Sequence, residues 1–65
     1  MWMVVGMVSS AKKAAQLQKA LEEEGILVKL RNVSARAKTT GDTIEVLVLE
    51  SEADVAREIL VENGL

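Results

Sequence analysis

Apolar and polar positions alternate most regularly from Thr43 to Glu50, TIEVLVLE. Because side chains on an extended chain alternate between two faces, Ile44, Val46 and Val48 share one face. The opposite face carries both apolar and polar residues, namely Thr43, Glu45, Leu47 and Leu49. The β-branched residues, with Gly41-Asp42 before them and Ser51 after, favour a strand over a short helix. Apolar residues on both faces need cover on both sides, so we expect this strand in the middle of a sheet.

Two further stretches have strand character. Residues Trp2 to Val8, WMVVGMV, are predicted as the first strand, with Gly6 as a bulge or a point of close backbone approach. Residues Ile26 to Arg31, ILVKLR, are predicted as the second strand. One face of this second strand includes Lys29 and Arg31, which predicts an edge position.

Two amphipathic helices complete the pattern. The first begins after a cap at Ser9 or Ser10, runs to about Glu24 and ends at Gly25, with a buried stripe of Ala14, Leu17 and Leu21. The second is expected to start at the capping-box variant Ser51-Glu52-Ala53-Asp54. Its buried stripe is predicted to be Val55, Ala56, Ile59 and Leu60, and Asn63-Gly64 ends it.

The resulting order β-α-β-β-α predicts an α+β sandwich in a single domain spanning residues 1–65. We expect a three-stranded, antiparallel-mixed sheet in the order 1-3-2, with both helices on one face, like a ferredoxin-like fold that lacks its last strand. One sheet face, including Leu47 and Leu49, and the edge of the first strand would then stay uncovered. Contiguous apolar surface of this kind is typical of interfaces, so we expect a homo-oligomer formed through the open face or an edge.

Composition limits the available chemistry. The chain has 65 residues, no cysteine and no histidine, so it lacks disulfides and the commonest metal ligand and general base. The apolar start has no charged region before it and is too short to span a bilayer, so we expect a cytoplasmic protein without a membrane partner. Residues 1–40 carry seven Lys and Arg against three Glu, whereas residues 41–65 carry one Arg against seven acids. The net charges of +4 and −6 point to a polar partner or to head-to-tail association.

Three short motifs resemble one known family over nearly the whole chain. They are Glu24-Gly25-Ile26, the strand end from Val46 to Glu50, and the acidic, alanine-containing stretch from Glu52 to Leu60. Together with the opening MWMVVGMVSS, they resemble a family of short bacterial proteins described as prokaryotic signal-transducing proteins of unknown function. The resemblance implies a βαββα domain loosely similar to PII and ACT modules, which sense small molecules and bind partners. It implies no catalytic residue.

Two basic groups are candidate binding sites. Ser9, Ser10, Lys12 and Lys13 gather where the first strand enters the first helix, a place that favours an anion, although a serine cap with solvated lysines is the simpler interpretation. Lys29, Arg31, Arg36 and Lys38 lie on or beside the loop of residues 32–42, where they could bind an acidic protein surface or a small anion. A solvated loop without a ligand is the alternative.

Nucleic acid is not an expected partner, because the net charge is −2 and Trp2 is the single aromatic residue available for base stacking. We interpret Trp2 instead as a packing or interface residue. The carboxylates include Glu22 to Glu24, Glu45, Glu50, Glu52 and Asp54, but no spacing brings two of them into a pocket. We therefore expect no enzymatic activity, no cofactor and no metal, and a regulatory or protein-interaction module in signal transduction. The alternative is a PII- or ACT-like sensor of a small anion or metabolite.

Overall fold

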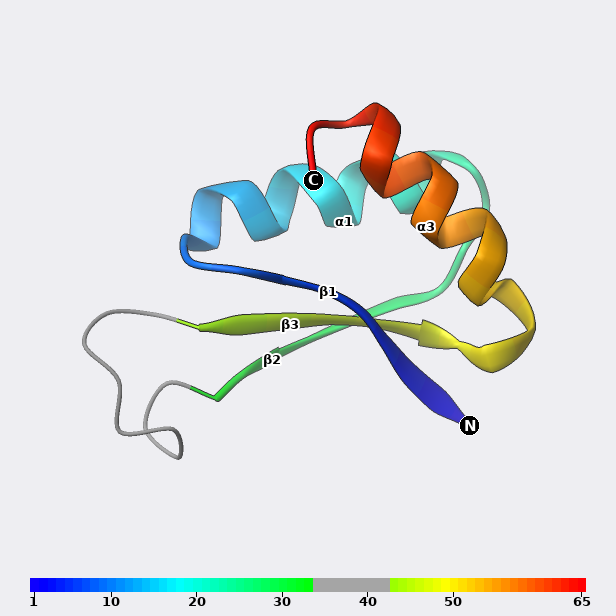
Figure 1. The fold of residues 1–65 in the computed structure, drawn as a ribbon, viewed down its shortest axis with the longest axis horizontal. Coiled ribbons are helices and arrows are strands. Elements are labelled where there is room, and N and C mark those ends of the chain that lie inside the picture. Colours follow the sequence, from blue (N-terminus) through cyan, green and yellow to red (C-terminus); the bar gives the residue numbers. More distant parts are fainter. Residues whose placement is uncertain (34–42) are drawn as a thin grey trace.

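The computed structural model describes residues 1–33 and 43–65. Its elements follow the predicted order and are drawn in Figure 1. They are β1 (Trp2–Val8), α1 (Ala11–Glu23), β2 (Val28–Asn32), β3 (Ile44–Leu49), the short 3-10 helix η1 (Glu50–Glu52) and α3 (Ala53–Glu62).

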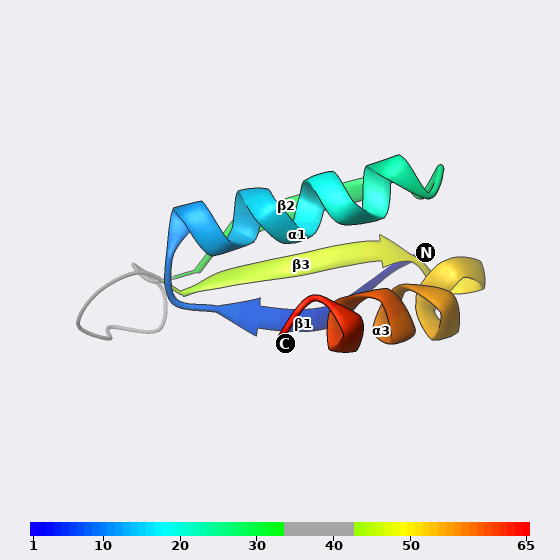
Figure 2. The same cartoon turned by 90° about the horizontal axis from the view of Figure 1, so that it is seen from above.

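The sheet has the order β1-β3-β2, and both pairings are antiparallel. β3 is therefore the central strand, and β2 lies at an edge, as the sequence predicts. Both helices cover the same face of this sheet (Figures 1 and 2). The prediction of an α+β fold in the order 1-3-2, ferredoxin-like without its last strand, is confirmed.

The core lies between the helices and the helix-facing side of β3. Val46 and Val48 are fully buried there, beneath Leu17 and Leu21 of α1 and Leu60 of α3. Each buried leucine contributes about 1.5–3 kcal/mol relative to an exposed one. Three alanines of the helices are buried as well, and their small side chains allow close approach of a helix; they are Ala14, Ala53 and Ala56.

A β-bulge in β1 decides which of its side chains face the helices. Val4 pairs with Leu47 but Gly6 pairs with Val46, so Val5 is the extra residue. Val5 packs against the core, and Gly6 lies beneath the last residue of the chain: a Cβ built on it would stand 2.8 Å from Leu65 Cδ2. The predicted bulge is therefore present next to Gly6, at Val5, and the group that lies close to the Gly6 backbone is the side chain of Leu65.

Both helices end in a Schellman motif. In α1, Gly25 has φ 80° and donates its N–H to Glu22, while the next residue, Ile26, donates to Leu21 at 3.1 Å. In α3, Gly64 has φ 88°, and Leu65 donates to Leu60 at 3.0 Å. The residue after Gly25, Ile26, is buried in the core, whereas the residue after Gly64, Leu65, stays partly exposed.

This motif explains why β2 starts later than predicted. The predicted strand begins at Ile26, but the structure begins it at Val28. Because the backbone N–H of Ile26 bonds to Leu21 in the motif, it is not available for strand pairing. The side chain of Ile26 is buried all the same, at 4% exposure.

The predicted start of α3 is wrong. η1 precedes the helix, Glu52 occupies the cap position, and no side chain caps the first turn, so Ser51 and Asp54 form no capping box. The predicted buried stripe is also partly wrong, because Val55 is half exposed and Ala53 is buried in its place. Ala53 is the residue that lies one turn before Ala56, on the side that packs on the sheet.

Gly25 offers a direct test of the α1 terminus. Replacing it with alanine should cost about 1–2 kcal/mol of unfolding free energy, because an L-residue is strained at positive φ. No atom lies within 4 Å of the added Cβ, so the cost would come from the backbone alone. Urea denaturation measures it, and Gly25→Asn should lose less because asparagine tolerates this conformation. Equal stability of Gly25→Ala and the wild type would contradict the motif.

Candidate functional site

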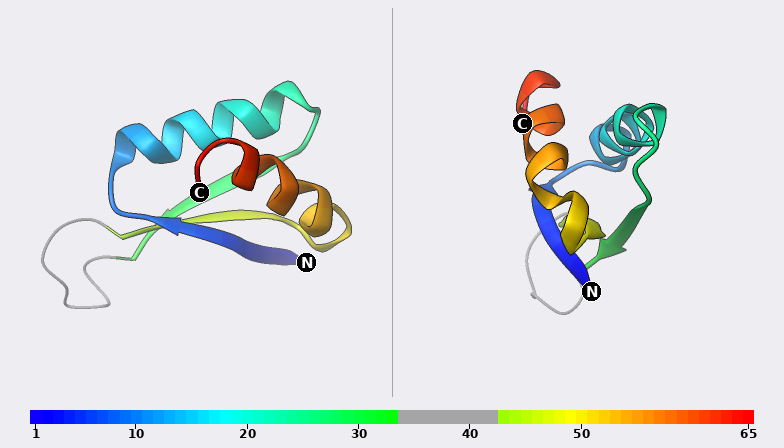
Figure 3. Two further views of the ribbon diagram at one scale, coloured as in Figure 1. Left: turned by 45° about the horizontal axis from the view of Figure 1, so that its top comes forward. Right: turned by 90° about the vertical axis from the view of Figure 1, so that its right-hand side faces the viewer.

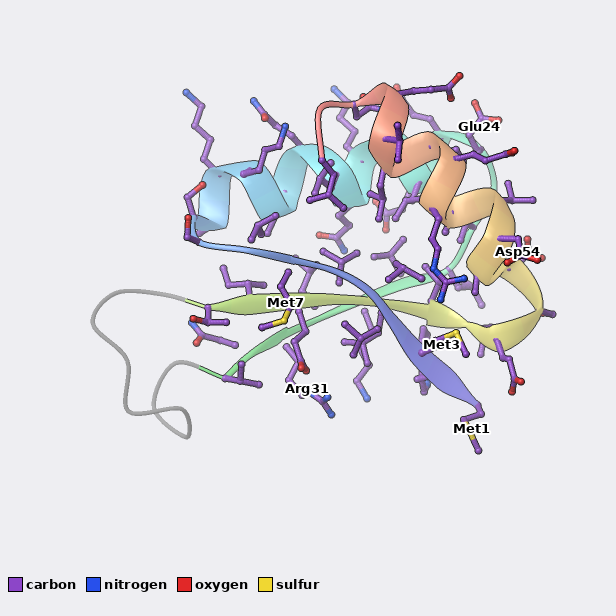
Figure 4. The ribbon with its side chains drawn as sticks, viewed as in Figure 1. Met1, Met3, Met7, Glu24, Arg31 and Asp54 are labelled. Carbon is purple, nitrogen blue, oxygen red and sulfur yellow. The ribbon has the colours of Figure 1, made fainter. Side chains whose placement is uncertain are left out.

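The face of the sheet opposite the helices is the candidate site. The strand registers place side chains from all three strands on it, and we call these residues the open face: Trp2, Val4, Met7, Lys29, Arg31, Glu45, Leu47 and Leu49. No described helix covers this side, as Figure 3 shows. In Figure 4, Arg31 extends from it, away from the helices.

The apolar part of the open face follows β1. Trp2, Val4 and Met7 are 40%, 37% and 56% exposed. The neighbouring Leu47 on β3 is only 4% exposed, although it lies on the same face. The centre of the open face is therefore shielded from solvent. Its β1 side presents a row of partly exposed apolar side chains.

A contact across the central strand explains the burial of Leu47. The Nζ atom of Lys29 on β2 lies 5.6 Å from the centroid of the Trp2 ring on β1. In the strand registers Trp2 is opposite Leu49 and Lys29 is opposite Leu47, so the two side chains meet above β3. A cation–π contact at an exposed position contributes about 0.5–1 kcal/mol, and here it also holds the indole over the sheet.

The polar part of the open face is an ion pair between β2 and β3. Arg31 Nε donates to Glu45 Oε1 at 2.6 Å, and the two residues are direct cross-strand partners. The Arg31 side chain is 46% exposed, so the pair adds at most about 1 kcal/mol to stability. With Lys29, the charged groups give the open face a net charge of +1.

Two of the four predicted partner-binding residues lie in the described part of the chain. Lys29 and Arg31 lie together on the open face, and each has a partner there. Arg36 and Lys38 lie outside the described residues. Alternation along β2 was the signal that assigned Lys29 and Arg31 to one face.

The predicted anion-binding residues have structural contacts at the start of α1. The Ser10 hydroxyl accepts the backbone N–H of Lys13 at 3.0 Å and caps the helix. Lys13 Nζ donates to the carbonyl of Asn63 at 2.9 Å, so it links the start of α1 to the end of α3. A cation is favourable at that helix C-terminus. Ser9 and Lys12 are exposed beside them.

Removing the Lys13 ammonium should therefore lower stability, not ligand binding. We expect Lys13→Met to cost about 0.5–1.5 kcal/mol, the usual contribution of one hydrogen bond, and Lys12→Met to cost almost nothing. Thermal unfolding with and without inorganic phosphate measures both effects. A melting temperature that phosphate raises in the wild type, and not in Lys13→Met, would instead support the anion site.

A second exposed surface lies on the helix layer, at a place that no sequence pattern predicted. A shallow groove runs between the end of α1 and α3; we call it the α3 groove, lined by Glu24, Val55, Arg57, Glu58, Ile59, Val61 and Glu62. Val55 and Val61 are 49% and 68% exposed. Figure 4 places Glu24 beside α3, on the side of the domain away from the open face.

Comparison with known proteins found no matching family model, curated protein or solved structure. Within residues 1–33 and 43–65, no group of three or more potential ligand side chains could hold a metal ion. Among the helices of the described part, none is long and apolar enough to cross a membrane.

Proposed function

We propose that the chain is a non-enzymatic, cytoplasmic interaction module that associates with a second copy of itself through the open face. One observation carries this proposal: both helices cover the same side of the sheet, and the other side exposes Trp2, Val4 and Met7 in a row. Exposed apolar rows of this kind are typical of protein interfaces. The resemblance to signal-transducing proteins suggests a regulatory role for the association.

The open face is a better association surface than either sheet edge. β1 carries the bulge at Val5, which interrupts regular pairing along its free edge. β2 has only five residues, and the Schellman motif at the end of α1 precedes it. Short and bulged edge strands are features that discourage edge pairing.

A second copy of the chain is the partner that this proposal specifies. A 65-residue domain buries only about 60% of the surface of its unfolded chain, so its stability is marginal. Association of folded copies adds stability by mass action. A specific interface covers about 800 Å² on each partner. Because the chain exposes 4328 Å² in total, such an interface would remove a substantial part of its surface from water.

Sedimentation velocity tests the proposal with a matched pair of variants. Met7→Glu places a carboxylate on the open face, and Gln16→Glu places one on the exposed side of α1. We expect the wild type and Gln16→Glu to associate as concentration rises, and Met7→Glu to associate at least about tenfold more weakly, a loss of roughly 1.4 kcal/mol.

Urea denaturation at low concentration serves as the control for folding, and all three proteins should unfold at similar midpoints. A wild type that stays monomeric at every concentration would contradict the proposal. Equal weakening by Gln16→Glu would show that added charge alone, and not its place on the open face, controls association.

A further inference from the structure

The open face and the α3 groove carry opposite charges on opposite sides of one domain. Lys29 and Arg31 against Glu45 give the open face a net charge of +1. In the groove, Glu24, Glu58 and Glu62 against Arg57 give a net charge of −2. We infer, on the basis of the proposed self-association, that the open face of one copy docks on the α3 groove of the next, head to tail.

Charge complementarity distinguishes this arrangement from a symmetric, face-to-face dimer. Two open faces in contact would bring two positive surfaces together, and Lys29 of each copy would lose its water against the other. An open face on an α3 groove instead brings Lys29, beside the Arg31–Glu45 ion pair, to three carboxylates. Complementary potentials across an interface favour the correct partner, whereas like charges disfavour it.

The groove also gains from a cationic partner. Glu58 and Glu62 are one turn apart on α3, so their carboxylates repel each other, and Glu24 adds a third from the end of α1. No Lys is among the residues that line the groove, and its one cation, Arg57, already contacts Asp54 at 3.3 Å. The ammonium of a docked Lys29 would relieve that repulsion.

α3 is long enough to reach from one outer strand of the sheet to the other. α3 has ten residues and is about 15 Å long, at 1.5 Å per residue. The outer strands of a three-stranded sheet are about 10 Å apart. In the inferred contact, the exposed Val55 and Val61 lie toward the row of Trp2, Val4 and Met7, and the carboxylates lie toward β2. This is the helix-on-sheet packing that the domain already uses on its other face.

Because the two surfaces lie on opposite sides of the domain, each added copy presents a free surface again (Figures 1 and 3). Such a heterologous contact continues as a chain or closes as a ring, whereas a symmetric contact stops at two copies. The association should also weaken as salt is added, because the charges at its rim are exposed.

Two charge reversals test the inference. Lys29→Glu alters only the open face, and Glu62→Lys alters only the groove. We expect each variant alone to associate at least about tenfold more weakly than the wild type, and their equimolar mixture to recover much of the association. In the mixture, the Glu62→Lys variant supplies a wild-type open face, and the Lys29→Glu variant supplies a wild-type groove. The two altered surfaces carry reversed charges, a glutamate on the open face and a lysine in the groove.

Glu23→Lys is the matched control, because Glu23 is exposed at the end of α1 and does not line the groove. Glu62 lies in the last turn of α3, where the helix dipole favours a cation, so Glu62→Lys should keep the fold. Sedimentation reports the size of the assemblies. Trp2, the single tryptophan, reports through its fluorescence whether the open face is covered.

The outcomes separate the two proposals. Loss of association in Glu62→Lys, with recovery in the mixture, supports head-to-tail docking. A wild type that associates, together with a Glu62→Lys variant that associates equally well, overturns the inference and leaves a face-to-face contact. A wild type that does not associate overturns the inference together with the proposed function.

Discussion

Replacing Leu60 with alanine should destabilise the domain by about 2–5 kcal/mol, the usual cost of removing a buried leucine. Leu60 is fully buried in α3. Its side chain lies close to Gly6 of β1, next to the side chain of Leu65. A domain of this size has only about 3–10 kcal/mol of stability in total, so the variant should be partly unfolded at room temperature. Urea denaturation followed by circular dichroism measures the change.

Leu27→Ala is the matched control, because it removes the same atoms from a leucine that is 65% exposed. We expect it to change the unfolding free energy by less than about 0.5 kcal/mol. A Leu60→Ala variant as stable as Leu27→Ala would mean that α3 does not pack on the sheet as described.

Replacing Leu47 with glutamate should prevent folding at neutral pH. Leu47 lies at the centre of the open face but is 4% exposed, between Val4 and Lys29 and below the contact of Lys29 with Trp2. A carboxylate at this position would lose most of its water, and such changes commonly cost more than about 4 kcal/mol. Circular dichroism and the dispersion of amide signals in NMR spectra measure the loss of structure.

Met7→Glu provides the comparison on the same face, because Met7 is 56% exposed and its replacement keeps access to water. We expect that variant to fold. If Leu47→Glu also folds with wild-type stability, the centre of the open face is hydrated and the Trp2 ring does not cover it.

Local patterns were sufficient to predict the architecture. An uninterrupted apolar run identified β1 with its bounds, and period-two alternation identified β3 to within one residue at each end. Apolar residues on both faces of β3 assigned it to the centre. Glycines after two amphipathic stretches marked both helix ends, since only positive φ allows the Schellman motif. Each of these signals depends on residues that are close together in the sequence, so each can be recognised without the structure.

The errors arose where the chain makes a different hydrogen bond or packing contact from the one that its pattern predicts. Ile26 continues the apolar alternation of β2, yet its backbone closes the end of α1. Ser51 and Asp54 have capping-box spacing, yet the chain first makes η1 and begins α3 at Ala53. The helix spacing of Val55 was compatible with burial, and only the packing of α3 shows that it faces outward.

The candidate site was predictable in part. Alternation assigned Leu47 and Leu49 to the open face, but the bulge at Val5 changes the facing of β1, so Met7 could be assigned only from the strand register. The α3 groove depends on α1 and α3 lying side by side, which brings Glu24 to Glu58 across 34 positions of the sequence. No local pattern signals a contact of that kind.

The most direct test of the open face as the association surface is a series of amide and indole NMR spectra recorded over increasing protein concentration. We expect concentration-dependent shifts for Trp2, Val4, Met7 and Leu47, including the Trp2 indole N–H. Amides of the fully buried Leu17 and Leu21 should stay unchanged as internal controls. Shifts confined to residues outside the open face, or spectra that do not change with concentration, would contradict it.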